Sequence, residues 1–396
     1  MQYIPREQEK QIHRALERNK SVLLLGPRQT GKTTLIRRLE ADLTISLVTP
    51  EMRLRYEKEP DILRKEIEAL RPKEKNRPLV VLDEVQKVPE LLNVAQDLID
   101  RIQANFILTG SSARKLRRGH QLNLLPGRLV TLRLDPFTSA ESMPKDLEER
   151  LLYGSLPGIV AVESPQDREV DLESYVTLYL EEEIRAEALV RNLASFARFV
   201  ELAASESGRT SNFRKISQEI GVAHTTIAAY YEILEDCMIA ERVDPITKSM
   251  TRKKLTRSSK YLFFDLGVRR AAAREGTKPA REHWGHLFEQ WVGLELIRAA
   301  RLSTHGDRVF FWRDPDGPEI DWVLERKDEL IPIEVKWSSS ANETDIRHLK
   351  TFLAEYKNAQ IGYVVCQAPR KMKLAGQIYA LPWQDIPGLI NKPYKP

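Results

Sequence analysis

A glycine-framed segment near the start of the chain has the residue types of a phosphate-binding loop. Residues 26–33 read Gly-Pro-Arg-Gln-Thr-Gly-Lys-Thr between an apolar run and a helix-forming stretch, which is the G-x-x-x-x-G-K-[ST] pattern in its strand–loop–helix context. Gly26 and Gly31 let backbone N–H groups turn toward phosphates, and the helix N-terminus adds positive potential. We expect Lys32 to reach the β- and γ-phosphates of ATP and the Thr33 hydroxyl to hold Mg²⁺. The predicted nucleotide-contacting residues of this loop are Gly26, Pro27, Arg28, Gln29, Thr30, Gly31, Lys32, Thr33 and Thr34.

Two carboxylates follow a buried strand farther along the chain. The run Leu-Val-Val-Leu ends in Asp83 and Glu84, and a parallel sheet presents its ligand-facing edge where such strands end. We expect Asp83 to hold Mg²⁺ through water and Glu84 to orient or deprotonate the attacking water. Hydroxyl groups follow the next strand, so Thr109 and Ser111 are both candidates for contacting the γ-phosphate. The spacing does not choose between them.

An arginine on a predicted turn is a candidate for stabilising phosphoryl charge. Arg128 follows Pro-Gly and precedes another apolar run. A guanidinium stabilises the charge of a transferring phosphoryl group and can come from a neighbouring subunit. In that case a ring or another homo-oligomer follows. The alternative is a surface arginine that caps a turn.

The composition is that of a folded protein with several domains. The chain has 396 residues, of which 42% are hydrophobic and 30% charged, and about two to three domains are expected at this length. Cys237 and Cys366 are its two cysteines, which excludes a disulfide framework and a zinc cluster. No apolar leader begins the chain, and no later run approaches the roughly 18 residues of a membrane span. We therefore expect a cytoplasmic protein with no membrane partner, and its net charge of +5 is compatible with nucleic acid.

The first part of the chain alternates strand-like and helix-like stretches. This alternation predicts a parallel sheet that is covered by helices. The strand-like runs are residues 21–25, 45–49, 78–82, 105–109 and 128–134. A stretch rich in Pro and Gly at residues 135–160 then closes this unit.

The middle of the chain has the pattern of a helix-turn-helix. Residues 213–222 and 223–231 predict two helices joined by a glycine-containing turn. The second helix would expose His224, Thr225 and Thr226 at its N-terminal end, the part that meets base edges in such motifs. The alternative is a helical lid that uses this arrangement only for packing.

A basic segment follows these helices. It contains no carboxylate, and its cations are Lys248, Arg252, Lys253, Lys254, Arg257 and Lys260. We expect it to form a wing that binds the phosphate backbone of DNA. The predicted nucleic-acid contacts are His224, Thr225, Thr226, Arg252, Lys253, Lys254 and Arg257. A second basic cluster at residues 114–118 either lines a pore or solvates a helix face.

Four charged residues give the last part of the chain its candidate chemistry. Glu289 lies in an amphipathic helix pattern, and Asp321 lies in a strand pattern. Glu334 and Lys336 are two apart in another strand and therefore project to the same face. Carboxylates suit a hard divalent cation, and a lysine nearby can orient water or stabilise phosphoryl charge. We therefore predict Glu289, Asp321 and Glu334 as metal ligands and Lys336 as a catalytic residue.

Several of these segments together resemble the prokaryotic AAA-type ATPases that carry a C-terminal domain of unknown function. The segments are residues 26–33, 82–86, 108–112, 127–128, 154–158, 179–184 and 261–267, which span nearly the whole chain. The resemblance implies an AAA-like core in which Lys32, Asp83, Glu84 and Arg128 act on ATP. The chain departs from these relatives at residues 182–183, which read Glu-Glu where Arg-Asp is usual.

The C-terminal pattern resembles the PD-(D/E)XK nuclease fold. Asp321, Glu334 and Lys336 stand in the signature positions, and Glu289 stands as the helix carboxylate. This fold is often retained as a module that does not cut.

These patterns predict an α/β multidomain protein. Its expected parts are an AAA-like P-loop domain with a parallel sheet at 1–150, a helical lid or linker at 151–195, a winged-helix-like domain at 196–265 and a nuclease-like α/β domain at 275–396. We expect an ATPase that binds DNA, remodels it or translocates on it, and forms a homo-oligomer. Two alternatives remain open: an ATP-gated, metal-dependent DNA nuclease, and a nucleotide-dependent switch that binds a protein partner.

Overall fold

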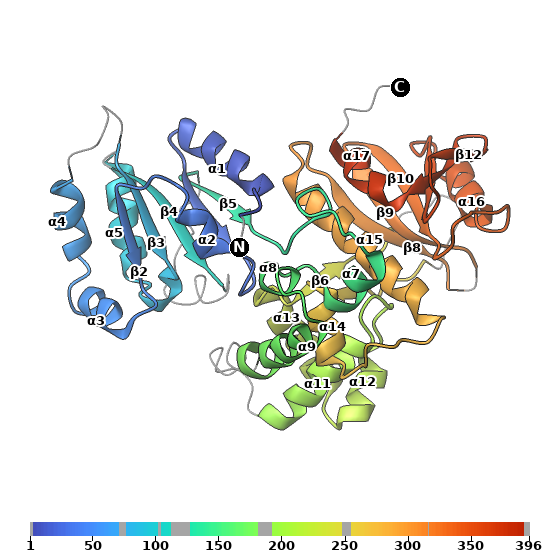
Figure 1. Cartoon of the computed structure of the whole chain (residues 1–396), viewed down its shortest axis with the longest axis horizontal. Coiled ribbons are helices and arrows are strands. Elements are labelled where there is room, and N and C mark those ends of the chain that lie inside the picture. The colour runs from blue at the N-terminus through green and yellow to red at the C-terminus, as the bar shows by residue number, and fades with distance from the viewer. Residues whose placement is uncertain are drawn as a thin grey trace. The chain divides into compact units, whose positions relative to one another are not determined.

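The computed structural model of the chain consists of two compact units. It describes residues 3–70, 77–101, 104–111, 127–180, 192–247, 255–315 and 317–391. One unit comprises Met1–Asp135 with Asp236–Ile239, and the other comprises Pro136–Glu235 with Ala240–Pro396 (Figure 1). The first unit includes the first 135 residues of the region predicted as the P-loop domain, 1–150. The three later domains predicted from the sequence share the second unit.

The first unit is built on a five-stranded parallel sheet with the strand order β2-β3-β4-β1-β5. Its strands are β1 (Ser21–Leu25), β2 (Leu43–Ser46), β3 (Leu79–Asp83), β4 (Asn105–Gly110) and β5 (Leu129–Arg133). The α/β class and the parallel sheet expected from the sequence are confirmed. Because β4 lies between β1 and β3, the carboxyl ends of these three strands are neighbours at one edge of the sheet.

Helices cover both faces of this sheet (Figure 1). Val22 and Leu24 of β1 pack with α1 (Glu7–Glu17) and α2 (Lys32–Ile36). Leu23 and Leu25 contribute to the opposite core. That core is formed with α3 (Pro50–Lys58), α4 (Ile62–Glu68) and α5 (Leu91–Asp100). Alternate side chains of a strand point to opposite faces, so a strand covered on both sides reads as the continuous apolar run seen in the sequence.

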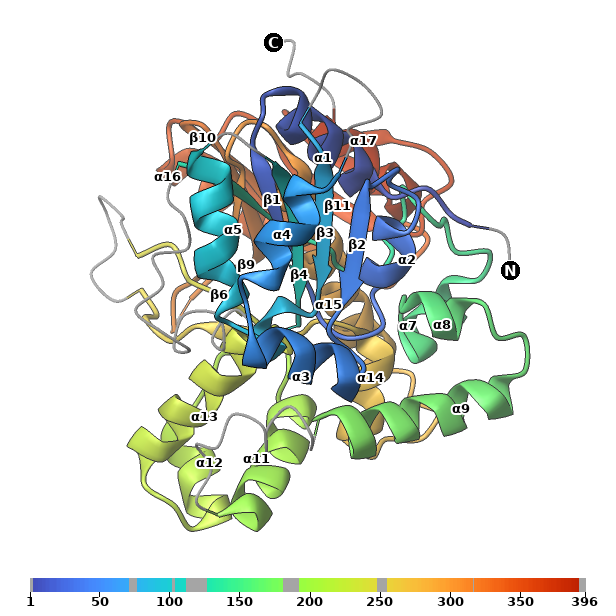
Figure 2. The ribbon, with the colours of Figure 1, turned by 90° about the vertical axis from the view of Figure 1, so that its left-hand side faces the viewer.

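The second unit begins with helices and a small hairpin. The helical elements are α7 (Leu147–Tyr153), α8 (Pro157–Val160), α9 (Pro165–Ser174), η2 (Tyr175–Leu180), α11 (Leu193–Ser205), α12 (Phe213–Ile220), α13 (His224–Asp236) and α14 (Leu266–Ala272). Gly221 ends α12 with a φ of 80°, a left-handed conformation that favours glycine. Strands β6 (Ala240–Val243) and β7 (Lys260–Phe263) pair antiparallel. Helices α11, α12 and α13 form a compact group (Figure 2).

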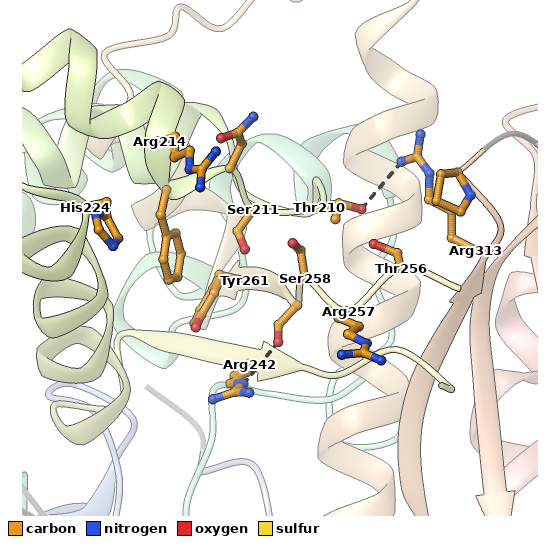
Figure 3. Close-up of a pocket in the computed structure, with 14 residues that line it drawn as sticks. Thr210, Ser211, Arg214, His224, Arg242, Thr256, Arg257, Ser258, Tyr261 and Arg313 are labelled. Atoms are coloured by element: carbon orange, nitrogen blue, oxygen red, sulfur yellow. Dashed lines mark hydrogen bonds between the residues drawn. The ribbon is translucent and has the colours of Figure 1, made fainter. Parts of the chain in front are cut away.

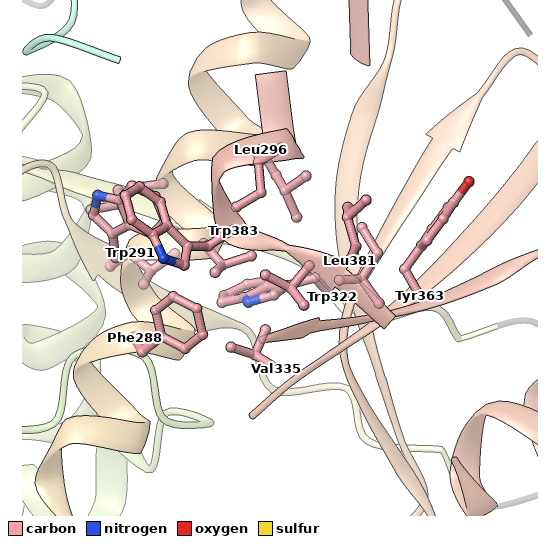
Figure 4. Packing of buried hydrophobic residues seen from close by; sticks show 14 of the residues in the cluster. Phe288, Trp291, Leu296, Trp322, Val335, Tyr363, Leu381 and Trp383 are labelled. Atoms are coloured by element: carbon pink, nitrogen blue, oxygen red, sulfur yellow. The ribbon is translucent and has the colours of Figure 1, made fainter. Parts of the chain in front are cut away.

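A six-stranded mixed sheet completes the second unit, with the order β12-β13-β11-β10-β9-β8. Its strands are β8 (Arg308–Arg313), β9 (Glu319–Arg326), β10 (Glu329–Val335), β11 (Gly362–Cys366), β12 (Met372–Ala375) and β13 (Ile378–Pro382). One face packs on α15 (His283–Leu302) and α17 (Ile386–Asn391), and the other packs on α16 (Arg347–Glu355). Trp291, Trp322 and Trp383 lie in the α15 core (Figure 4).

Buried polar contacts join the parts of the second unit. Arg298 of α15 donates to the carbonyl oxygens of Phe137 at 3.1 Å and Phe264 at 2.7 Å. Glu295, one turn earlier, accepts a hydrogen bond of 2.8 Å from the backbone N–H of Ser139. These contacts tie the segment that begins the second unit to α15. Within the described part of the chain, no helix has the length and apolar character that crossing a bilayer requires.

Candidate functional site

The predicted phosphate loop connects β1 to α2, and its shape depends on two glycines. A Cβ atom on Gly26 would lie 2.4 Å from the backbone oxygen of Leu134, so no larger residue fits there. Gly31 has a φ of 94°, which an L side chain rarely adopts. Gln29, at the exposed tip, has a φ of 61°. The loop therefore has the tight, inward-turning backbone that a phosphate cradle needs.

Lys32 lies inside the loop rather than in solvent. Its Nζ donates to the carbonyl oxygens of Gly26 at 2.7 Å and Pro27 at 2.9 Å, and the residue is 6% exposed. The hydroxyl of Thr30 also donates to the Pro27 oxygen, at 3.0 Å. The phosphate oxygens of a bound nucleotide would replace these two loop carbonyls as partners of the ammonium. Of the other predicted contacts, Pro27 is buried, Arg28 half-buried and Thr34 exposed.

An arginine that sequence reasoning missed holds the loop from outside. Arg6, at the start of α1, donates through Nη1 to the oxygen of Thr30 at 2.8 Å and through Nη2 to the oxygen of Asp135 at 2.6 Å. The side chain is 5% exposed. No motif surrounds Arg6, so only the folded chain reveals this role.

Asp83 and Thr33 meet at the carboxyl edge of the sheet. The Thr33 hydroxyl donates to Asp83 Oδ2 at 3.3 Å, and the Thr109 hydroxyl donates to Asp83 Oδ1 at 2.6 Å. Thr109 also accepts the backbone N–H of Glu84 at 3.0 Å. These contacts bring together four predicted site residues, from the end of β3, from β4 and from the start of helix α2. Asp83 and Thr109 are both buried.

Glu84 is held in an unusual backbone conformation. Its φ is 61°, the left-handed region that non-glycine residues rarely occupy. Gln86 Nε2 donates to Glu84 Oε2 at 2.5 Å and to Ser111 Oγ at 3.2 Å. Ser111 thus reaches Glu84 through Gln86, whereas Thr109 contacts Asp83 and the Glu84 backbone directly. Sequence reasoning did not select Gln86, although it follows the two carboxylates closely.

Arg128 lies at the other edge of the same sheet. It immediately precedes β5, and its backbone oxygen accepts a hydrogen bond of 3.2 Å from Ser21 N at the start of β1. The phosphate loop follows the opposite end of β1. The Arg128 guanidinium pairs with Asp100. This chain therefore does not bring Arg128 to its own phosphate loop.

The second group of predicted residues lies around α15, β9 and β10, and Lys260 from β7 joins it. Lys260 Nζ lies 2.8 Å from Glu289 Oε1, 4.8 Å from the ring centroid of Trp322 and 5.1 Å from that of Phe311. Burial alone would lower the pKa of Lys260, but the carboxylates of Glu289 and Asp321 outweigh burial and raise it. Lys260, which the sequence assigned to the basic wing, is thus a buried ion-pair partner.

Glu334 and Lys336 follow the predicted strand geometry. Lys336 Nζ lies 3.3 Å from Glu334 Oε2, and Asp321 Oδ2 accepts the backbone N–H of Val335 at 2.8 Å. Burial, and then the neighbouring Asp321 carboxylate, raise the pKa of Glu334 well above its ordinary value. Burial likewise raises the pKa of Glu289, although Lys260 opposes it.

These residues do not form a metal centre. Across the residues that the structure describes, no group of three or more His, Cys, Asp or Glu side chains could hold a metal ion. Glu334 alternates along β10 with Ile333 and Val335, which pack with α15, so its carboxylate lies on the sheet face away from that helix. Glu289, on α15, forms an ion pair with Lys260. The predicted ligand set of Glu289, Asp321 and Glu334 therefore does not fit one ion in this arrangement.

The predicted nucleic-acid contacts lie partly around a cavity in the second unit. This cavity has a volume of about 840 Å³, and His224 and Arg257 line it (Figure 3). Thr225 is exposed next to His224 at the start of α13, and Thr226 is half-buried. Three predicted contacts, Arg252, Lys253 and Lys254, and the clusters at 114–118 and 182–183 lie outside the described residues.

The glycine loop and the carboxylates on a parallel sheet are matched by a known family. Residues 18–143 match the AAA domain family. The N-terminal part of the chain is therefore an AAA-type P-loop domain, as the sequence resemblance implied. Beyond the AAA domain, residues 144–278 and 284–386 match two further family models, each described as a domain of unknown function.

Two proteins are similar to this chain over most of its length. The chain is 25% identical over 377 residues to an uncharacterized protein of Mycobacterium tuberculosis, covering 95% of this chain and 82% of that protein. It is 21% identical over 423 residues to an uncharacterized protein of Methanocaldococcus jannaschii, covering 93% and 85%. Among solved structures, the Pif1 helicase from Candida albicans matches at 15% identity and a TM-score of 0.25, covering 43% of this chain and 47% of the helicase. The match thus spans about half the length of that structure.

Proposed function

We propose that the protein is an ATP-hydrolysing, DNA-binding protein that uses nucleotide state to remodel DNA or to translocate on it. The observation that carries the proposal is the group of Thr33, Asp83, Glu84 and Thr109 at the carboxyl edge of the AAA domain sheet. A phosphate loop alone supports binding. An adjacent carboxylate pair ordered by a buried hydroxyl supports hydrolysis as well.

The residues of the loop fit ATP and Mg²⁺ by their chemistry. Thr33 and Asp83 offer a hydroxyl and a carboxylate, 3.3 Å apart, which are the hard oxygen ligands that Mg²⁺ takes. Bound Mg²⁺ would neutralise charge on the phosphates. When ATP binds, Lys32 Nζ donates to phosphate oxygens in place of the carbonyl oxygens of Gly26 and Pro27. Glu84 orients the attacking water and accepts its proton, while Thr109 keeps Asp83 and the Glu84 backbone in place.

Arg128 supports a homo-oligomer as the active form. Because it lies at the sheet edge away from the phosphate loop of its own chain, the nucleotide that it serves belongs to a neighbouring subunit. Its present partner is Asp100. An arginine supplied in trans stabilises the charge that develops on the transferring phosphoryl group.

The ATPase rate with and without DNA tests this function. We expect single-stranded, forked or duplex DNA to raise the rate of the intact protein. Glu84→Gln should lower the rate by about 100-fold or more, because a general base is lost, while nucleotide binding is retained. Glu57→Gln makes the same change at an exposed position of α3 and should have no effect. An ATPase rate that Glu84→Gln leaves unchanged contradicts hydrolysis at this site. Absence of binding to every DNA form at low salt, where phosphate contacts are strongest, favours the protein-partner switch instead.

The nuclease alternative has weaker support. The proximity of Asp321, Glu334 and Lys336 favours a nuclease-like fold, whereas the Lys260–Glu289 ion pair favours a domain that holds DNA without cutting it. We therefore expect no Mg²⁺-dependent cleavage of DNA. Mg²⁺-dependent cleavage of DNA that is lost in Lys336→Ala would instead support the ATP-gated nuclease alternative.

A further inference from the structure

A cavity of the second unit is lined by positively charged side chains. Its volume of about 840 Å³ lies between the N-terminal parts of α12 and α13, the β6–β7 hairpin and the end of β8 (Figure 3). Arg214, Arg242, Arg257 and Arg313 line it, and none of its 14 described lining residues is Asp or Glu. The start of α13, a helix of 13 residues, adds the positive end of its dipole beside His224. A ligand of this cavity must be an anion.

Two of the four arginines are available for such a ligand. Arg242 pairs with Asp244 at 2.8 Å, and Arg313 lies 3.5 Å from Glu319. Arg214 and Arg257 are both exposed and have no carboxylate partner within the described residues. Exposed guanidinium groups beside hydroxyl donors suit phosphate oxygens, because both groups donate hydrogen bonds to them.

An aromatic wall gives the cavity a second kind of contact. Phe213 and Tyr261 line it, and Tyr231 lies behind them. Phe213 stacks on Tyr231 with a centroid distance of 5.2 Å and an interplanar angle of 19°, and Tyr231 stacks on Tyr261 at 4.1 Å. The core thus holds these rings in fixed positions. Rigid aromatic faces beside cations are the arrangement on which unpaired bases stack.

The size and the aromatic wall together favour unpaired nucleotides. A volume of this size falls in the range of about 300–1,000 Å³ that encloses a small ligand, too small for a double helix. In a duplex the faces of the bases are already covered by their neighbours, so they are not free to stack on protein rings. Given the DNA-binding function proposed above, on which this step rests, we infer that the cavity binds a short single-stranded stretch of nucleic acid, with its phosphates on Arg214 and Arg257 and a base against Phe213.

A second cavity limits the proposed binding site on one side. It has a volume of about 270 Å³ and shares Thr210 and Arg313 with the first. Arg313 donates to the Thr210 hydroxyl at 3.5 Å across this border (Figure 3). Beyond it, the described lining of the smaller cavity has four carboxylates beside Arg209 and Lys260, whereas no carboxylate is among the described residues that line the first cavity, so the first cavity is the more favourable for phosphate. The bound strand therefore lies on the arginine side of Arg313.

Direct binding without nucleotide tests the inference on the full-length protein. The probes are fluorescein-labelled oligo(dT), oligo(U) and a blunt duplex of equal length, titrated at several salt concentrations. Arg214→Ala and Arg257→Ala each remove one exposed cavity arginine. Arg198→Ala is the matched control, because Arg198 is an exposed arginine on α11 that does not line the cavity.

We expect the single strands to bind more tightly than the duplex. Each cavity variant should weaken binding by about tenfold at low salt and reduce the slope of log K against log [salt] by about 0.7, the value for one phosphate contact on a single strand. Arg198→Ala should change neither quantity. If the cavity variants lose affinity for oligo(dT) and oligo(U) alike, the cavity binds single strands of either kind. A loss of affinity for oligo(dT) alone assigns the cavity to DNA, and a loss for oligo(U) alone assigns it to RNA.

Phe213→Leu tests the base contact separately. It retains an apolar side chain for packing against Tyr231, and it should weaken single-strand binding by roughly fivefold or more without changing the salt slope. Single-strand binding that equals duplex binding, or that both arginine variants retain, overturns the inference while leaving the ATPase proposal intact. Loss of ATP hydrolysis in Glu84→Gln with unchanged strand binding keeps the two conclusions separate.

Discussion

The ammonium of Lys260 lies 2.8 Å from the carboxylate of Glu289, and this contact joins the β6–β7 hairpin to the long helix α15. Lys260 is buried and Glu289 is half-buried, and two aromatic rings lie beside the ammonium. An ion pair in such a place contributes little net stability, but the loss of one partner leaves an uncompensated buried charge.

Lys260→Met should therefore destabilise the second unit strongly. We expect a loss of about 3–5 kcal/mol, the usual cost of breaking a buried pair, measured as a shift of its urea unfolding transition. The double variant Lys260→Met with Glu289→Gln should recover much of that loss. Lys357→Met, at an exposed position, is the control. A single variant as stable as the control would mean that the pair is not buried in solution.

Thr109→Val should separate hydrolysis from nucleotide binding. Valine keeps the shape of threonine but cannot donate to Asp83 or accept the N–H of Glu84. We expect the ATPase rate to fall by about 10- to 100-fold, as for other groups that orient a site carboxylate, with nucleotide affinity almost unchanged. Thr109→Ser should retain activity. Ser111→Ala, which removes the hydroxyl that contacts Gln86, should have the smaller effect, and the reverse ranking would assign the γ-phosphate contact to Ser111.

Mixing two inactive variants should show whether Arg128 acts between subunits. Arg128→Ala retains a complete phosphate loop, and Lys32→Ala retains the arginine. Each alone should lose on the order of 1,000-fold or more in ATPase rate if the arginine stabilises phosphoryl charge. A mixture should regain measurable activity, because some interfaces then combine both intact parts. No recovery from variants that still co-assemble argues that Arg128 only pairs with Asp100.

His286→Gln should make the second unit less sensitive to acid. Burial, followed by the charges of Arg269 and Arg209, lowers the pKa of His286 to about 4. Its Nε2 donates to the oxygen of Ser207 at 3.0 Å. Between pH 6.5 and that value the unfolded state binds a proton that the folded state excludes, so stability falls as the pH falls.

The loss attributable to His286 is at most about 3 kcal/mol. Glutamine retains a donor and does not titrate. The difference between wild type and His286→Gln in urea midpoint should therefore change across this pH window and stay constant above it. If the urea midpoints of wild type and His286→Gln change in parallel with pH, folding does not lower the pKa of His286.

The sequence predicts the AAA domain well because its chemistry is local. The phosphate loop is a contiguous pattern, and Asp83 and Glu84 end a strand whose apolar run reveals its burial. The direct contact of Thr109 with Asp83 depends on β4 lying between β1 and β3, which no single segment encodes.

Other site residues cannot be identified from the sequence alone. Arg6 acts on a loop that is distant in sequence, and nothing around it forms a motif. Lys260 belongs to a basic segment, so its charge predicts exposure, yet β7 places it against Glu289. The spacing of Glu334 from Lys336 is visible in the sequence, but the position of Glu334 relative to α15 depends on which face of β10 packs with that helix.

The tetrapeptide Asp236–Ile239 has a practical consequence for dissecting this protein. It belongs to the first unit although both flanking segments belong to the second, and Met238 is part of the AAA domain core. Arg133 of β5 also donates to the Met238 oxygen at 3.3 Å. A fragment that stops at Asp135 would thus lack Met238 of the AAA domain core. A fragment that stops at Ile239 would divide the second unit, because α15 binds Phe137 and Ser139. Gene truncation and domain exchange should therefore keep the two units in one chain.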